Sequence, residues 1–247
     1  QMCIRDRSTS QAGIIEITTV DASLGEVLVA FASAGIKRGL AVVNPPDGGW
    51  VDEDQVKMLF KQAGLEAWTF ERNDGVHLRE RMYALMDDIE SVLEANADAP
   101  LVLPVDQHFN VKGIGLVAIG YVQSGRVSVH DEVLLLPANG TGNAKSLQVM
   151  DDDVEVASAG DRVGLALRNA KEDHLTGGTI IVHPPIEDKR ANLSVPLAVD
   201  QHHRSSLQLS TSPFQKRVLA AGDVIHASVD LQFVVGRIKD VSGDTVI

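Results

Sequence analysis

Cysteine, aromatic residues and long apolar runs are scarce in this chain. One cysteine and 4% aromatic residues among 247 exclude a disulfide-stapled secreted domain. No stretch reaches the roughly 18 unbroken apolar residues of a membrane-spanning helix, and the N-terminus lacks the apolar run of a secretory signal. We therefore expect a cytoplasmic protein without membrane contact.

Positive charge is also scarce. The chain carries 22 Lys and Arg against 34 Asp and Glu, for a net charge of -12. A protein with this balance does not wrap nucleic acid as a polycation, so we expect no DNA contact, and any RNA contact must be local. The content of 44% apolar and 23% charged residues is that of an ordinary globular protein.

The first 99 residues alternate between strand and helix patterns. Residues 1–12 join no pattern, and we expect them to be non-native or disordered. Strands are predicted at 14–20, 39–43 and 66–70, and helices at 22–34, 52–62 and 76–95. This order of strands and helices is typical of a small α/β domain with a parallel sheet, which we place at residues 13–99.

From residue 100 onward the pattern is all β. Six short strands are predicted at 117–123, 126–130, 132–136, 145–150, 161–167 and 179–183, which is the usual content of a small closed barrel. We place this barrel at residues 100–187. Further strands at 193–199, 206–210, 223–229 and 232–239 predict a second, partial barrel over residues 188–247.

Glycines at fixed intervals mark the predicted barrel. Residues 103–137 read L-P-V-D-Q-H-F-N-V-K-G-I-G-L-V-A-I-G-Y-V-Q-S-G-R-V-S-V-H-D-E-V-L-L-L-P. Gly113 and Gly115 permit a tight bulged corner, Gly120 permits a strand to bend, and Ser124 with Gly125 suits the turn of a hairpin. A second stretch, A-G-D-R-V-G-L-A-L, contains Gly160 and Gly164.

These two stretches together resemble the second domain of translational GTPases such as elongation factor Tu. The family pattern begins P-[IV]-[DE]-x-x-F and ends A-G-[DE]-x-V-G, and the arginine after Gly-Asp is closer to the selenocysteine-specific relatives. The resemblance implies a translation-factor barrel at 100–187 and a domain-3-like barrel at 188–247. It also implies that residues 13–99 are the α/β remnant of a P-loop GTPase-like domain, partial or degenerate.

The resemblance gives a role to the loop after the second strand. The family places its guanine-reading N-K-x-D there, and this chain has Asn44-Pro45-Pro46-Asp47. Asp47 would accept hydrogen bonds from the base and Asn44 would brace the loop, but Pro45 replaces the lysine and removes a backbone donor. A plain turn explains the same residues.

The motifs that hold phosphates and magnesium are missing from this sequence. It contains no G-x-x-x-x-G-K-[ST], and no D-x-x-G with a following switch segment precedes Asp21. Nothing in it would cradle the β- and γ-phosphates or hold Mg²⁺. We therefore assign no catalytic residue and no metal site, and expect GTP and Mg²⁺ to bind only if a missing N-terminal half exists.

The resemblance also implies that one rim of the barrel contacts the aminoacyl end of tRNA. Asp106 and Phe109 match the family's acid and aromatic, whereas Leu116 stands in place of a threonine and Arg162 in place of an asparagine. Loss of that hydroxyl and amide weakens the match. From the residues alone, Phe109 also fits a core position and Asp106 a capping position.

Several charged residues have two interpretations. Arg126, Lys145, Arg162 and Arg168 would pair with RNA phosphates, or are ordinary solvent-facing charges on alternating strands. The segment D-Q-H-H at 200–203 contains metal-ligand types, but adjacent histidines on a strand point to opposite faces. We interpret these histidines as surface residues.

The sequence leads to one functional hypothesis and two alternatives. The first is an elongation-factor-like protein that contacts tRNA, the ribosome or a translation partner, with GTP binding weakened or absent in this chain. The alternative is a fragment of an active GTP-binding elongation factor whose phosphate-binding half is missing. A third is a non-translational use of the barrel, as in the GTPase subunit of a sulfate-activating enzyme.

Overall fold

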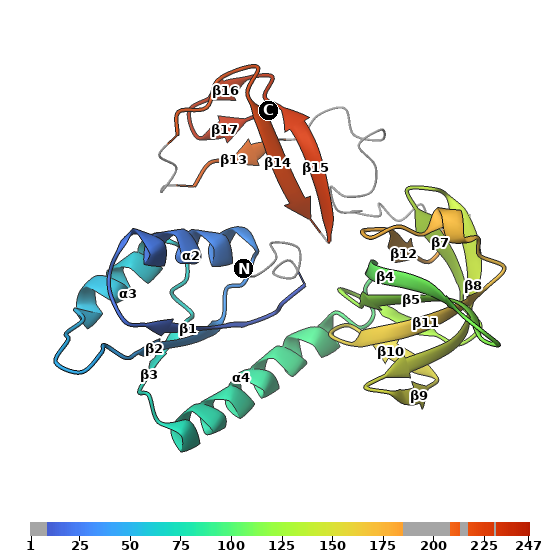
Figure 1. Cartoon of the computed structure of the whole chain (residues 1–247), viewed down its shortest axis with the longest axis horizontal. Coiled ribbons are helices and arrows are strands. Elements are labelled where there is room, and N and C mark those ends of the chain that lie inside the picture. The colour runs from blue at the N-terminus through green and yellow to red at the C-terminus, as the bar shows by residue number, and fades with distance from the viewer. Residues whose placement is uncertain (1–8, 185–207, 213–216, 230) are drawn as a thin grey trace.

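The computed structural model describes residues 9–184, 208–212, 217–229 and 231–247. An N-terminal α/β unit is followed by a long helix, a closed β-barrel and a set of C-terminal strands (Figure 1). In these described residues no helix is both long enough and apolar enough to cross a membrane. The predicted order of an α/β region followed by an all-β region is confirmed.

The α/β unit contains a parallel sheet of three strands. They are β1 (Gly13–Ile17), β2 (Gly39–Val43) and β3 (Thr69–Glu71), in the order β1-β2-β3. The helices α2 (Ala22–Ser33) and α3 (Glu53–Gln62) connect them. β3 begins later than predicted because the backbone N–H of Trp68 donates to the carbonyl of Leu65 and closes a turn there.

Aromatic packing holds α2 and α3 against the sheet. The ring of Trp68 lies 4.8 Å from Phe31 and 5.6 Å from Phe60 between centroids, and all three side chains are buried. Glycine at positions 13 and 39 makes room for the indole, because a Cβ at either position would lie 2.7 Å from the Trp68 ring. One face of the sheet thus has a packed core.

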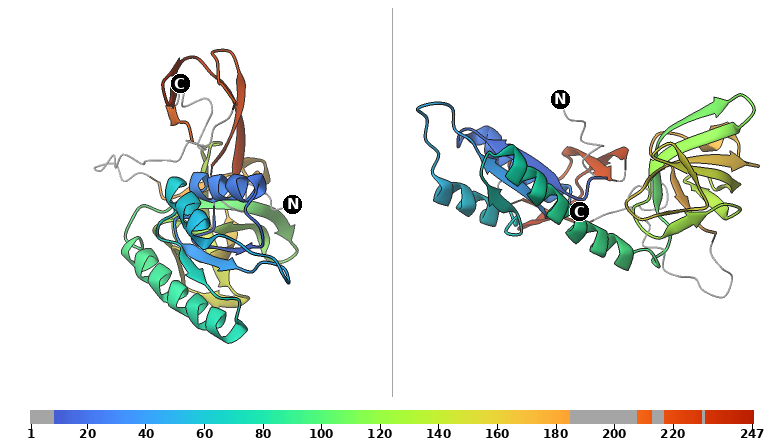
Figure 2. Two further views of the ribbon diagram at one scale, coloured as in Figure 1. Left: turned by 90° about the vertical axis from the view of Figure 1, so that its left-hand side faces the viewer. Right: turned by 90° about the horizontal axis from the view of Figure 1, so that it is seen from below.

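The helix α4 (Gly75–Ala95) leads from the sheet to the barrel (Figures 1 and 2). Asp74 caps it by accepting a hydrogen bond from the backbone N–H of His77 at 2.8 Å. None of its side chains is fully buried. α4 therefore covers the sheet without packing tightly against it.

The barrel closes through six strands. They are β4 (Leu103–Val111), β5 (Gly115–Tyr121), β7 (Glu132–Leu136), β8 (Gly140–Val149), β11 (Arg162–Arg168) and β12 (Ile180–Val182). Their order is β11-β5-β4-β12-β7-β8, and β8 pairs again with β11 to close the ring. Inward side chains such as Leu103, Val133 and Leu165 are completely buried.

The set of barrel strands differs from the expected set. β4 was not among the six predicted strands, and the predicted strand at 126–130 is instead the short β6 (Arg126–Ser128), which pairs with β10 (Val156–Ser158). A further short strand, β9 (Asp152–Val154), pairs with β8. Polar residues and a break in the register of β4 hide its alternation in the sequence.

Three of the barrel glycines serve close turns or contacts. Gly113 and Gly115 have φ of +88° and +107° in the turn between β4 and β5. A Cβ on Gly120 would lie 2.4 Å from the carbonyl oxygen of Pro104, so glycine allows β4 and β5 to approach closely at this position. The expected hairpin turn at Ser124–Gly125 is not formed, because β5 and β6 belong to different sheets.

The described C-terminal residues form two small antiparallel groups. β13 (Leu209–Ser210), β17 (Thr245–Val246) and β16 (Val241–Ser242) lie in that order, and β14 (Val224–Val229) pairs with β15 (Gln232–Arg237). The strands β14 and β15 match the predictions at 223–229 and 232–239. The predicted strand at 193–199, the segment 200–203 and the boundary at 187 lie outside the described residues.

Candidate nucleic-acid interface

The outer surface of β4, β5 and β11 brings together most of the predicted contact residues. In a strand, successive side chains point to opposite faces. The register pairs Phe109 with Val117 and Val117 with Ala166, so these three share the outer face. Arg162 and Arg168 lie on the same face of β11, because Val163 and Leu167 between them point into the core.

A β-bulge at Asp106 turns Phe109 outward. The pairing of β4 with β5 jumps from Val105 opposite Gly120 to Gln107 opposite Ile119, which leaves Asp106 as the extra residue. The bulge reverses the parity of the strand beyond it. Phe109 is consequently 40% exposed, and its interpretation as a core residue was wrong.

Arg162 lies over an aromatic ring at one end of this surface. Its guanidinium lies 5.8 Å from the ring centre of Tyr121, which is its cross-strand partner on β5. A cation and an aromatic ring attract one another within about 6 Å, so this contact favours one placement of the guanidinium. Tyr121 was not chosen as a site residue from the sequence, although it alternates outward with Val117 and Ile119.

Arg168 lies at the opposite end of β11. It lies six positions along the strand from Arg162, which corresponds to about 20 Å. The two arginines therefore cannot contact the same phosphate. They border a surface that presents Phe109 and the side-chain-free Gly164 between them.

The turn that precedes Arg162 is fixed by the Ala-Gly-Asp motif. The carboxylate of Asp161 accepts a hydrogen bond from the backbone N–H of Ser158 at 2.8 Å, and Gly160 has a φ of +100°. A Cβ on Gly160 would lie 2.5 Å from Cδ1 of Leu93 on α4. The same turn therefore positions Arg162 and contacts the C-terminal end of α4 through Leu93.

Acidic residues also lie near this surface, so it is not a basic patch. Asp153 accepts a hydrogen bond from Gln148 at 2.9 Å, and Glu172 accepts one from Asn110 at 2.6 Å. The ammonium group of Lys145 donates to the carbonyl of Ile114 at 2.6 Å. This surface can therefore bind a ligand through an exposed aromatic ring and a few cations, and not through an extended patch of positive charge.

Two of the predicted positions do not belong to the outer surface. Leu116 is buried in the barrel core, where it cannot take the role of the family's threonine. Arg126 forms an ion pair with Asp98 and donates to the carbonyl of Ala97 at 3.2 Å. These contacts attach the barrel to the segment that follows α4.

The predicted guanine loop lies at the end of β2, in the α/β unit. The side-chain amide of Asn44 donates to the carboxylate of Glu16 at 2.6 Å, and its backbone N–H donates to Ile17 at 2.9 Å. Asp47 is exposed in a turn that the N–H of Gly49 closes on the carbonyl of Pro46 at 2.7 Å. Asn44 therefore connects β2 to β1.

A charged cluster that the sequence did not predict connects β3 to α4. The carboxylate of Glu71, 8% exposed, contacts His77 Nε2 at 2.6 Å and Arg81 Nε at 2.8 Å. Burial raises the pKa of the Glu71 carboxyl, but donors from Arg81, Thr69 and His77 outweigh that effect and the pKa lies below its usual value of 4.5. The spacing of His77 and Arg81 by four residues was the available signal.

Comparison with known proteins identifies the barrel. Residues 115–182 match the family model described as elongation factor Tu domain 2. This part of the chain is therefore similar to the second domain of elongation factor Tu. The match begins at β5, so Asp106 and Phe109 on β4 lie outside the matched range even though β4 belongs to the same barrel as β5.

Proteins similar in sequence to this chain include archaeal ones. An uncharacterized protein of Methanocaldococcus jannaschii is 28% identical over 94% of this chain and 68% of its own length. The selenocysteine-specific elongation factor of the same organism is 35% identical over 42% of this chain and 22% of its own. The elongation factor 1-alpha of Methanospirillum hungatei is 27% identical over 68% of this chain and 43% of its own.

Solved structures of translation factors share the fold. The crystal structure of a bacterial selenocysteine-specific elongation factor superimposes with a TM-score of 0.68 at 20% identity, over 98% of this chain and 40% of that one. Elongation factor SelB of Methanococcus maripaludis, in complex with a GTP analogue, gives a TM-score of 0.62 at 19% identity, over 97% and 54%. This chain spans about half or less of the length of these solved relatives.

Proposed function

We propose that this chain is an elongation-factor-like binding protein whose barrel contacts the aminoacyl end of tRNA through the outer surface of β4, β5 and β11. The observation that carries the proposal is the outward placement of Phe109 together with the Arg162–Tyr121 cation–π contact on one face of a barrel similar to elongation factor Tu domain 2. The cytoplasm, where translation takes place, is the proposed location.

The chemistry of the surface supports a single-stranded RNA end as ligand. Exposed aromatic rings stack on unpaired bases, and each such stack contributes about 1–3 kcal/mol. The guanidinium of Arg162 lies over the ring of Tyr121, and this exposed side chain can offer donors to a phosphate or a ribose. Because the whole chain is acidic, recognition depends on these few groups.

Binding of charged tRNA tests the proposal. Substitution of Phe109 by alanine removes the exposed ring and should weaken binding of charged tRNA about tenfold, within the range of one base stack. Substitution of Arg162 by glutamine should lower the slope of log affinity against log salt by about 0.7. Val156→Ala, at a similarly exposed apolar residue on β10, is the control and should bind as the wild type does.

A loss that is equal for Phe109→Ala and Val156→Ala would contradict the role of the outer surface. If charged tRNA does not bind at all while purified ribosomes co-sediment with the protein at modest salt, the partner is the ribosome and the tRNA assignment is wrong. If neither tRNA nor ribosomes bind, the translational function itself is refuted.

We infer further that GTP binding is weakened or absent in this chain. Support comes from Asn44, whose amide is engaged by Glu16, from Pro45 in place of a lysine, and from the absence of a phosphate-cradling motif in the 247 residues. Titration with fluorescent GTP and GDP should give no saturable binding below about 100 μM, near -5.5 kcal/mol. Micromolar affinity would overturn this inference.

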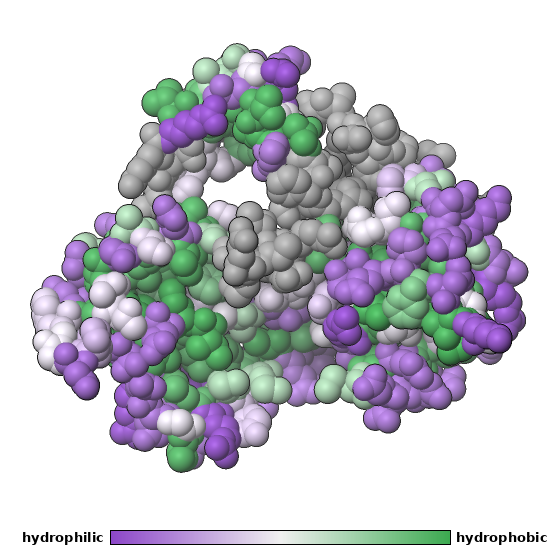
Figure 3. Space-filling model, viewed as in Figure 1, coloured by the Kyte–Doolittle hydropathy of each residue, from purple (hydrophilic) through white to green (hydrophobic). Residues whose placement is uncertain are grey.

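The alternative function, a part of an active GTP-binding elongation factor, has its own support. β1 is an edge strand of the sheet, and a small apolar groove of about 180 Å³ lies between it and α4. Ile14, Met82 and Met86 in this groove are 53%, 42% and 59% exposed, and apolar surface is visible over the α/β unit (Figure 3). A phosphate-loop lysine encoded within about 100 residues upstream in the same reading frame would favour this alternative.

A further inference from the structure

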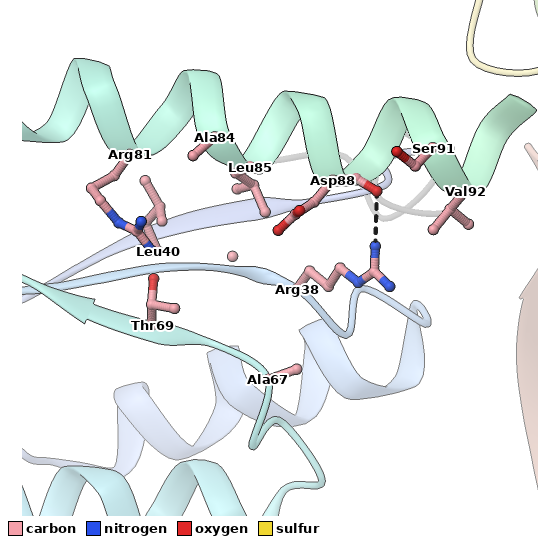
Figure 4. A pocket seen from close by; sticks show the side chains of 11 residues that line it. Arg38, Leu40, Ala67, Thr69, Arg81, Ala84, Leu85, Asp88, Ser91 and Val92 are labelled. Carbon is pink, nitrogen blue, oxygen red and sulfur yellow. Dashed lines mark hydrogen bonds between the residues drawn. The ribbon is translucent and has the colours of Figure 1, made fainter.

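A pocket of about 720 Å³ lies between α4 and the sheet (Figure 4). Small side chains help create it: Ala67 on the side of the sheet, and Ala84 and Ser91 on the side of the helix. Larger residues normally fill the space between a helix and a sheet. The volume falls within the range of 300–1,000 Å³, which is typical of pockets for small molecules.

The side-chain charges of Arg38 and Asp88, which both line this pocket, do not pair with each other. A guanidinium nitrogen of Arg38 donates to the backbone carbonyl of Asp88 at 3.3 Å. Within the described part of the chain, neither Arg38 nor the carboxylate of Asp88 forms an ion pair. The second arginine of the pocket, Arg81, is already neutralised by Glu71 at 2.8 Å.

Apolar side chains form the remaining walls. Leu40 projects from the sheet, and Leu85 and Val92 project from α4 (Figure 4). The carboxylate of Asp88 points into the same space. The pocket thus offers one cation, one anion and an apolar surface to the same ligand.

We propose that this pocket binds a small zwitterion with an apolar body, of the kind represented by an aromatic or aliphatic amino acid. The carboxylate of the ligand pairs with Arg38, its ammonium group pairs with Asp88, and its apolar part lies against Leu40 and Leu85. A simple anion would meet the carboxylate of Asp88, and a simple cation would meet Arg38, so the two charges together select a ligand that carries both.

This site is separate from the proposed RNA surface and from the loop at Asn44. It lies under α4, on the face of the sheet opposite the packed core of Phe31 and Trp68. Its lining contains no residue of the barrel. A ligand here would fill the space that α4 leaves open and attach the helix to the sheet.

Three matched ligands test the proposal. L-tryptophan carries both charges, indole-3-propionate lacks the ammonium group and tryptamine lacks the carboxylate. Isothermal titration calorimetry should give the highest affinity for L-tryptophan. Amide resonances of Leu40, Thr69 and Leu85 should shift in nuclear magnetic resonance spectra, which locates the binding.

Charge variants assign the two contacts. Arg38→Gln should weaken L-tryptophan about tenfold and leave tryptamine unchanged, since a charged hydrogen bond to the carboxylate is lost. Asp88→Asn should weaken L-tryptophan and tryptamine about tenfold without weakening indole-3-propionate. The neighbouring exposed residues outside the pocket provide matched controls, Arg79→Gln and Asp87→Asn, which should bind as the wild type does.

A variant that fills the pocket provides an independent check. Ala84→Leu on the helix should abolish binding of all three ligands, while the nuclear magnetic resonance spectrum remains that of a folded protein. The proposal is overturned if the three ligands bind equally, if none produces a saturable signal, or if Arg38→Gln and Asp88→Asn behave like their controls. Shifts confined to Met82 and Met86 would instead place the ligand in the groove beside β1 and would equally refute the proposal.

Discussion

The barrel and the α4 side of the α/β unit differ in how many strand edges are paired and how many apolar side chains are buried. In the barrel every main strand has two neighbours, and inward residues such as Leu103 and Leu165 are completely buried. In the α/β unit β1 and β3 are open edges, and α4 buries none of its side chains fully. The barrel thus pairs its strand edges and buries its core within itself, whereas the α/β unit keeps surfaces that another molecule or segment can use.

The largest expected effect contrasts two leucines, one in each region. Leu165→Ala removes a fully buried side chain from the barrel core and should lower the free energy of unfolding by about 3 kcal/mol. Leu85→Ala beside the pocket should cost less than about 1 kcal/mol, because its side chain already faces open space.

Hydrogen exchange and tryptophan fluorescence separate the two regions in this experiment. Both tryptophans, Trp50 and Trp68, lie in the α/β unit, so their fluorescence during urea unfolding follows that unit, and exchange of barrel amides follows the barrel. Equal losses for the two variants would contradict the contrast in packing.

The next effect compares two glycines on neighbouring barrel strands. Gly120→Ala would place a Cβ 2.4 Å from the backbone oxygen of Pro104 and should destabilise the barrel by about 2 kcal/mol through forced strand separation. Gly164→Ala would meet Gln148 only at 3.9 Å and should change the stability by less than about 0.5 kcal/mol. Urea midpoints measured by circular dichroism compare them, and a reversed order would show that the close approach of β4 and β5 is unimportant.

A smaller effect concerns the junction between the two regions. Gly160→Ala places a side chain at a φ of +100° and against Leu93 of α4, which should cost about 1–2 kcal/mol. Because the clash lies at the end of α4, protection from hydrogen exchange should fall at residues 89–97 as well as in the barrel. A loss confined to the barrel would show that α4 does not depend on this turn.

The smallest effect is a pH dependence of the α/β unit. The pKa of Glu71 is lowered in the folded protein, so its stabilising contribution is complete above its usual value of 4.5 and is lost as the pH falls through the lower folded pKa. Glu71→Gln should remove about 1 kcal/mol at pH 7, a value reduced by the exposure of Arg81, 39%. The free energy of unfolding, followed by Trp68 fluorescence, should also depend less on pH below pH 4.5 in the variant than in the wild type.

If the wild type and Glu71→Gln lose stability in parallel on acidification, the contacts from Arg81 and His77 do not stabilise the carboxylate. Asp87→Asn, which changes an exposed acid on the same helix, is the matched control for this comparison and should retain the wild-type profile.

The sequence predicted the order of the elements well because periodicity is strong where strands and helices are regular. Residues 39–43 and 223–229 were predicted within one residue of β2 and β14. The barrel fold followed from the spacing of glycines and from the resemblance these carry. The strand β4 was missed since its polar residues and the bulge at Asp106 interrupt the alternation.

The placement of Phe109 shows why site residues are harder to predict than elements. Counting by two from the buried Val105 puts Phe109 inside the barrel, but the single extra residue at Asp106 reverses the parity and puts it outside. The partnership of Arg162 with Tyr121 depends on the register between two strands. The cluster at Glu71 depends on the orientation of α4 relative to β3. A single sequence specifies neither this orientation nor the register of the two strands.

The central claim is that the outer barrel surface, and not the α/β unit, carries the function. Protection of the aminoacyl ester of charged tRNA against hydrolysis tests this claim most directly. The wild type should slow deacylation, the double variant Phe109→Ala/Arg162→Gln should lose that protection, and Asn44→Ala/Asp47→Asn should keep it. The opposite pattern, with protection lost only in the α/β variant, would contradict the claim.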